Sequence, residues 1–143
     1  MTIARISEPA ETLLLVDDDL MLRSMETRVL RQEGYTVLEA ESAAEALQLA
    51  RVSGAIHLLI TDFMMPELDG LELTRQFRAV YPETPVLMVS GSELFLRARR
   101  KPNLSQFDYL AKPFLFDELL GKVRKLLDAN TPLPIGRKRC AEL

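Results

Sequence analysis

The sequence predicts an α/β fold in which one five-stranded parallel sheet is doubly wound, with helices on both faces. Two observations lead to this prediction. Short apolar runs alternate with segments of helical periodicity, and this alternation continues through most of the chain. Repeated strand–helix–strand units require right-handed crossovers, which produce a parallel sheet covered by helices on each side. The length of 143 residues suits one such domain.

Five strands and five helices are expected in alternation. The strands are expected at residues 12–16, 35–39, 58–61, 85–89 and 107–110. Three helices follow from apolar residues at helical spacing, namely Leu22, Met25, Val29 and Leu30; Leu71, Phe77 and Val80; and Leu119, Leu120, Val123, Leu126 and Leu127. Residues 42–52 and 92–100 are also expected to be helical. We expect one domain over residues 12–129, between an N-terminal extension (1–11) and a C-terminal tail (130–143) that contains two prolines and a glycine.

The composition is that of an ordinary globular protein and argues against some classes of function. The formal net charge of -3 gives no general attraction to nucleic acid, so we expect no nucleic-acid binding by this chain alone. No apolar stretch reaches the length of a membrane span, and the first residues do not resemble a secretory signal. The single cysteine, Cys140, cannot form an internal disulfide. We therefore expect a cytoplasmic protein without membrane contact.

Polar residues that carry chemistry stand at the ends of four expected strands. They are Asp17, Asp18 and Asp19 after the first strand, Asp62 after the third, Ser90 after the fourth and Lys112 after the fifth. The carboxyl ends of parallel strands share one edge of the sheet, where such folds place their working residues. Carboxylates gathered there repel by about 4 kcal/mol per pair at about 4 Å, with an effective dielectric constant of about 20. Mg²⁺, which prefers hard oxygen ligands and retains water, would offset this repulsion together with Lys112.

Each of these residues also has a simpler interpretation. Asp19 stands just before the first helical stripe and suits a turn or a helix N-cap equally well. Ser90 precedes Gly91 and a second serine, a composition typical of a turn, and Lys112 before a proline is typical of a solvated surface lysine. Four unrelated turn residues would rarely all be the types that a phosphoryl site requires, in order, at strand ends. The joint pattern therefore favours a phosphoryl-transfer site.

Four motifs carry a resemblance to a known family. They are LLLVDDD (13–19), LLITDFMMPELDG (58–70), VLMVSGS (86–92) and YLAKPF (109–114). Together they make the chain resemble the receiver domain of two-component response regulators. The resemblance implies the flavodoxin-like, CheY-like strand order 2-1-3-4-5. It also implies a phosphorelay protein that is not an enzyme acting on other molecules, because it catalyses only its own phosphorylation and dephosphorylation.

The resemblance implies an acceptor, a metal and a donor. Asp62 is the expected phosphoacceptor. Mg²⁺ is expected to bind Asp18 directly, Asp17 mainly through water, Asp62, and the backbone carbonyl of Met64. The donor is expected to be a phosphohistidine of a sensor histidine kinase or a histidine phosphotransfer protein. In physical terms, a carboxylate acts as the nucleophile and forms an acyl phosphate.

A conformational switch is also implied by the resemblance. Ser90 and Lys112 are expected to contact the phosphoryl group, and the peptide bond from Lys112 to Pro113 is expected to be cis, a form that only X-Pro bonds adopt at small cost. Ser90 is drawn toward the phosphoryl group and Tyr109 then turns inward. These movements are expected to remodel the surface formed by the fourth helix, the fifth strand and the fifth helix.

Residues 92–101, which include the expected fourth helix, combine apolar residues with four basic side chains. A half-buried helix with a solvated basic face is one interpretation. The other is a docking site for an acidic output protein or for a second copy of the chain, which would make a homodimer. The sequence does not identify the output partner.

Two other functions are compatible with parts of the sequence. Asp17 and Asp19 form a DxD pair after the first strand, as in small haloacid-dehalogenase-like phosphatases, although that interpretation leaves Asp62 and its loop unexplained. The chain is alternatively an interaction module that keeps the fold and signals without phosphorylation. The complete set of site residues argues against this second alternative.

Overall fold

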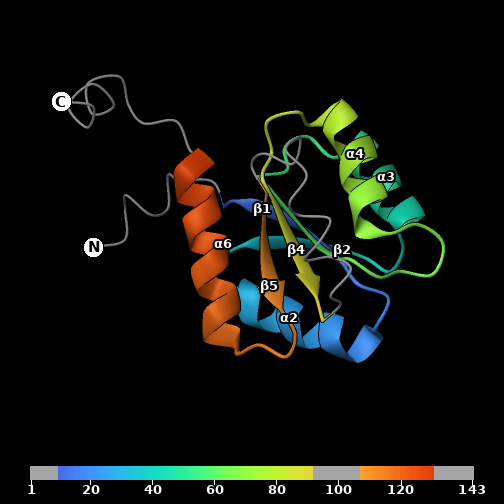
Figure 1. Ribbon diagram of the computed structural model, residues 1–143. Helices are drawn as coiled ribbons and strands as arrows, with labels where there is room; N and C mark the ends of the chain where they lie inside the picture. Colours follow the sequence, from blue (N-terminus) through green and yellow to red (C-terminus); the bar gives the residue numbers. More distant parts are fainter. Residues whose placement is uncertain (1–9, 92–106, 131–143) are drawn as a thin grey trace, which may run out of the picture.

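Five parallel strands form one sheet in the order β2-β1-β3-β4-β5, with helices on both faces (Figure 1). The computed structural model describes residues 10–91 and 107–130. The strands are β1 (Thr12–Val16), β2 (Thr36–Ala40), β3 (Leu58–Asp62), β4 (Val86–Ser90) and β5 (Phe107–Ala111). The described helices are α2 (Leu20–Gln32), α3 (Ala43–Val52), α4 (Gly70–Val80) and α6 (Phe116–Asn130). The predicted fold class and strand order are confirmed.

Several features predicted from the sequence lie outside the described residues. They are the helix expected at 92–100 with its basic side chains, most of the N-terminal extension and the tail after residue 130. Within the part of the chain that the structure describes, no helix combines the length and the apolar character needed to cross a membrane.

Two hydrophobic cores lie on opposite faces of the sheet. One core lies between the sheet and helices α3 and α4, and it includes Leu14, Leu59 and Phe77. The other lies between the sheet and helices α2 and α6, and it includes Leu13 and Leu58. All five side chains are fully buried. Because successive strand residues face opposite sides, a sheet covered on both faces requires continuous apolar runs rather than alternation, as these strands have.

The second, third, fourth and fifth strands each end one residue later than the sequence predicted. Asp62 and Ser90 are the last residues of β3 and β4 rather than the residues that follow them. The ladder continues because the amide of Phe63 donates to the carbonyl of Val89 (2.9 Å) and the amide of Lys112 donates to the carbonyl of Ser90 (3.0 Å). The strand prediction was therefore wrong by one residue here, and both side chains are held by the sheet itself.

The buried face of α2 differs from the predicted apolar stripe. Met25 is 46% exposed, whereas Arg23, Glu26 and Thr27 are buried together with Leu30. Met25 helped to predict the helix, but it lies outside the core. Successive residues of a helix point about 100° apart. A rotation of the helix about its own axis can therefore bury Glu26 and expose the preceding Met25. Here the helix turns polar side chains toward the end of the sheet.

Candidate functional site

Three carboxylates meet at the carboxyl edge of the central strands. Asp17 and Asp18 lie in the loop between β1 and α2, and Asp62 ends β3, which pairs with β1. One carboxylate oxygen of each lies within 4.8 Å of the other two. Asp17 and Asp62 are buried and Asp18 is exposed, so the cluster opens to solvent on one side. An all-oxygen donor set with an open side fits Mg²⁺, which retains several waters when it binds protein.

The protein alone compensates the negative charge of this cluster incompletely. Burial raises the pKa of Asp62 to about 6; the positive charge of Lys112 opposes this rise and the charge of Asp17 adds to it. Burial also raises the pKa of Asp17, although its carboxylate accepts a hydrogen bond from the amide of Asp19 (2.9 Å). A nearby cation stabilises the charged form of carboxyl groups whose pKa is raised in this way. The donor chemistry and the charge of the site therefore both fit a divalent metal ion.

Lys112 is paired with Asp62 and is not merely a solvated surface residue. Its Nζ lies 3.3 Å from Oδ1 of Asp62, and its side chain is 29% exposed. The amide of Lys112 donates to the carbonyl of Ser90, which places the lysine directly beside the end of β4. The peptide bond between Lys112 and Pro113 is cis.

Ser90 and Tyr109 lie on the two strands next to the acceptor strand. Ser90 is buried and pairs with Ala111 in the register of β4 and β5, so it is a strand residue rather than a turn residue. Tyr109 pairs with Met88 in the same register. Its half-buried ring packs against the core between the sheet and helices α3 and α4.

The loop after Asp62 is held close to the acceptor by a glycine. The amide of Gly70, the first residue of α4, donates to the carbonyl of Phe63 (2.7 Å). A Cβ atom at Gly70 would lie 2.6 Å from the carbonyl oxygen of Asp62 and 2.6 Å from Sδ of Met88. Only glycine permits such an approach. In the same loop Met64 is 56% exposed.

Asp19 is a helix cap and is not part of the carboxylate cluster. Its side chain accepts a hydrogen bond from the amide of Leu22 (3.1 Å), which confirms the N-cap interpretation. The three clustered carboxylates are those of Asp17, Asp18 and Asp62. A DxD phosphatase would instead require Asp17 and Asp19 to act together, so this arrangement disfavours that alternative.

Sequence reasoning missed two buried charged residues of α2 that lie beside the site. Arg23 donates from Nη1 to the carbonyl of Asp17 (2.7 Å) and from Nε to Oε1 of Glu39 (3.0 Å), so it fastens the loop after β1. Glu26 is 2% exposed, and burial raises its pKa to about 8. Their spacing could have revealed them in the sequence, because Arg23 and Glu26 share one helical face with Leu30.

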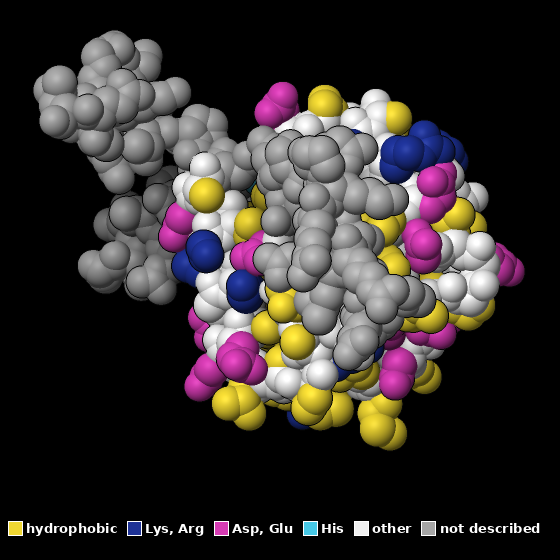
Figure 2. All heavy atoms as spheres, viewed as in Figure 1, with side chains coloured by type: hydrophobic (Ala, Val, Ile, Leu, Met, Phe, Trp, Pro, Cys, Tyr) yellow, Lys and Arg dark blue, Asp and Glu magenta, His cyan; other side chains and the backbone are white. Residues whose placement is uncertain are grey.

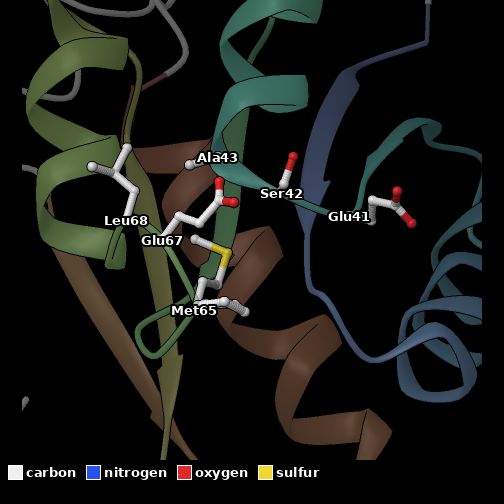
Figure 3. A pocket seen from close by; sticks show the side chains of 7 residues that line it. Glu41, Ser42, Ala43, Met65, Glu67 and Leu68 are labelled. Atoms are coloured by element: carbon white, nitrogen blue, oxygen red, sulfur yellow. The ribbon is translucent and has the colours of Figure 1, made fainter.

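A separate pocket of about 230 Å³ lies at the same edge of the sheet (Figure 3). It is formed by the start of α3 and by the loop between β3 and α4. Figure 3 shows the carboxylate of Glu67 extending toward Ala43, whereas the side chain of Glu41 points away from the other labelled residues. The pocket is smaller than the roughly 300–1,000 Å³ of typical small-molecule sites. It includes none of the residues predicted to take part in phosphoryl transfer.

Exposed apolar side chains follow, in the chain, two of the segments that carry site residues. Figure 2 shows hydrophobic side chains protruding along the lower rim of the molecule, where α2 lies in Figure 1. Leu20 and Met21 of α2 are 66% and 74% exposed, and Leu115, in the loop between β5 and α6, is 70% exposed. Apolar groups gathered beside a polar site are typical of a surface that contacts another protein.

Comparison with known sequences identifies the family. The model of the response regulator receiver domain matches residues 13–124. A sensor kinase CckA from Brucella abortus is 36% identical over 118 residues, which are 82% of this chain and 12% of that protein. A response regulator MprA from Mycolicibacterium vanbaalenii is 38% identical over 120 residues, which are 84% of this chain and 52% of that protein. The chain thus spans about half or less of the length of these relatives.

Solved structures agree with this assignment. The crystal structure of the receiver domain from the hybrid histidine kinase CckA is 35% identical, with a TM-score of 0.70, and the match covers 81% of this chain and 98% of that one. A CheY-like response regulator receiver domain protein from Methanospirillum hungatei is 27% identical, with a TM-score of 0.79 and coverage of 85% and 97%. The chain belongs to the response regulator receiver domains of two-component signalling systems.

Proposed function

We propose that Asp62 accepts a phosphoryl group from a phosphohistidine and that the acyl phosphate switches an output surface of the domain. One observation carries the proposal. Asp17, Asp18 and Asp62 converge within 4.8 Å, and Lys112 lies 3.3 Å from Asp62. This combination places a nucleophile, oxygen ligands for a metal and a fixed positive charge at one point, which is what phosphoryl transfer requires.

The residues divide the chemistry between them. An oxygen of Asp62 forms a bond to phosphorus while the phosphorus–nitrogen bond to the donor histidine breaks, and the electron pair leaves with the imidazole. Lys112 stabilises the charge on the phosphoryl oxygens, and the hydroxyl of Ser90 donates a hydrogen bond to one of them. Asp17, Asp18, Asp62 and the carbonyl of Met64 would hold Mg²⁺, which would supply further positive charge to these oxygens. The domain thus catalyses its own phosphorylation, and later its own dephosphorylation.

The donor belongs to a separate domain, either a sensor histidine kinase or a histidine phosphotransfer protein. The similarity to a sensor kinase and to a response regulator supports this class of donor. The exposed Leu20, Met21 and Leu115 provide an apolar surface on which such a donor docks. Replacing Met21 with glutamate is expected to slow transfer from the protein donor about tenfold. Labelling by acetyl phosphate, which needs no docking surface, is expected to be unchanged; equal slowing in both assays would contradict the docking role.

Ser90 and Tyr109 transmit the signal away from Asp62. Phosphorylation adds up to about two negative charges and three acceptor oxygens, which attract the hydroxyl of Ser90. Tyr109 lies on the neighbouring strand and turns inward as Ser90 moves, which changes the surface of β5 and α6. The helix expected at 92–100 would form the rest of this output surface and lies outside the described residues. To change a ratio of 99 inactive molecules to 1 active molecule into the reverse ratio, phosphorylation must favour the active state by about 5.5 kcal/mol.

A labelling experiment tests the proposed function. The protein is incubated with acetyl phosphate and Mg²⁺, and the phosphorylated residue is located by mass spectrometry. We expect one adduct on Asp62, and none in Asp62→Asn. Asp69→Asn is the matched control, because Asp69 caps α4 at the end of the same loop and its substitution keeps the acceptor intact. A wild-type protein that stays unlabelled, or a label that survives in Asp62→Asn, would refute the proposal.

The setting of the domain is also a proposal. We place the receiver at residues 12–129, between an extension and a tail, in a cytoplasmic protein that binds neither nucleic acid nor membrane through this chain. A homodimer and an output protein are further expected partners. The family match over residues 13–124 supports these limits without defining the rest of the protein.

A further inference from the structure

One buried acidic side chain beside the site has no role in the proposed chemistry. Glu26 lies on the inner face of α2 and is 2% exposed. Its Oε2 atom has no hydrogen-bond partner among the described residues. The charges that act on it most strongly are those of Asp17, Lys112 and Asp62, followed by Asp19. Glu26 is therefore buried, and close enough to the site for the charges of these residues to act on it.

A carboxyl group in this position is unfavourable for the fold itself. Burying a polar atom without a partner destabilises a protein, and an apolar side chain of similar size would pack against the sheet without that penalty. Burial raises the pKa of Glu26 to about 8; the charges of Asp17 and Asp62 add to the rise and Lys112 opposes it. The surroundings of Glu26 thus disfavour its charged form, and a divalent cation among Asp17, Asp18 and Asp62 would favour it.

We infer that Glu26 is a positioning residue of the cation site, which strengthens divalent-cation binding by Asp17, Asp18 and Asp62. Glu26 is not a ligand itself, since the carboxylates that lie within 4.8 Å of one another are Asp17, Asp18 and Asp62. It acts through the negative charge that its carboxyl group carries once a bound cation favours the ionised form, and through an oxygen that is available to accept a hydrogen bond. Groups that support metal ligands in this way typically change metal affinity about 10–100-fold when they are replaced. The inference rests on the proposed function, because it requires the cation site.

Two substitutions and one matched control test the inference. Glu26→Leu removes the carboxyl group, and Glu26→Gln keeps its shape but replaces the ionisable carboxyl group with a neutral amide. Thr27→Val is the control, because Thr27 is the next residue of the same helix, is 4% exposed and also has an Oγ1 atom without a partner among the described residues. The dissociation constant for Mg²⁺ is measured by calorimetry without any phosphodonor. The urea midpoint of unfolding is measured in the presence of a chelator.

We expect opposite effects on folding and on binding. Glu26→Leu should unfold at a higher urea concentration than the wild type but bind Mg²⁺ about tenfold more weakly or worse. Glu26→Gln should also bind Mg²⁺ more weakly, and Thr27→Val should bind it as the wild type does. Mg²⁺ affinities of both Glu26 variants that equal the wild-type value would overturn the inference and leave the proposed function intact. A wild-type protein that binds no Mg²⁺ would instead refute the cation site, and this inference with it.

Discussion

Replacing Asp62 with asparagine is expected to stabilise the domain at neutral pH when no divalent cation is present. Burial raises the pKa of Asp62 from 3.8 to about 6. The unfolded chain therefore releases this proton at a lower pH than the folded domain does. As the pH rises from about 4 to about 6, the folded state loses stability relative to the unfolded state, and the full penalty is present above that range. Asparagine has no such charge and avoids the penalty.

The size of the effect follows from the pKa. A rise from 3.8 to about 6, at about 1.4 kcal/mol for each pH unit, corresponds to about 3 kcal/mol of unfolding free energy. The side chain of Asp62 is 11% exposed, so solvent screening reduces this value only slightly. For a domain of this size, about 3 kcal/mol corresponds to a rise of roughly 10 °C in the midpoint of thermal unfolding.

Urea unfolding followed by circular dichroism, with a chelator present, measures this effect at several pH values. Asp62→Asn is expected to be more stable than the wild type near neutral pH, and the two proteins should converge below about pH 4. Asp108→Asn is the control, because it removes a carboxylate that pairs with Lys122 (3.2 Å) and should not raise stability. Equal stability at neutral pH, or an advantage that persists unchanged in acid, would refute the reasoning. Added Mg²⁺ should narrow the difference, because it binds the folded wild type.

Three further substitutions test the supporting geometry. Gly70→Ala should lower the free energy of unfolding by about 1–3 kcal/mol in thermal denaturation, because its Cβ would lie 2.6 Å from the carbonyl of Asp62; an unchanged midpoint would show that the loop adapts. Arg23→Leu should destabilise the fold by about 2 kcal/mol in urea, since the carbonyl of Asp17 loses its 2.7 Å hydrogen bond; a stability equal to the wild type would contradict this. Lys112→Ala should slow labelling by acetyl phosphate about 100-fold. The same change should tighten Mg²⁺ binding, because one positive charge leaves the site. Weaker Mg²⁺ binding would count against the role of Lys112 as the fixed positive charge beside Asp62.

The elements of the fold were predictable because local patterns reflect which faces are buried. Apolar runs of four or five residues identified all five strands, and apolar spacing identified helices α2, α4 and α6. The ends of strands were less predictable, because a strand ends where its backbone hydrogen bonds to the neighbouring strands end. The change from apolar to polar side chains does not mark that point. Asp62 and Ser90 are polar, yet both still belong to the sheet through the amides of Phe63 and Lys112.

The sequence by itself determined which chemical groups stand near the carboxyl ends of the strands, because crossover geometry brings those ends to one edge of the sheet. Only the tertiary structure decided which of them meet. Asp18 and Asp19 are adjacent and chemically identical, but Asp19 turns to cap α2 and Asp18 joins Asp17 and Asp62. Backbone periodicity sets which elements form, whereas the direction of each side chain depends on how elements distant in the chain pack together.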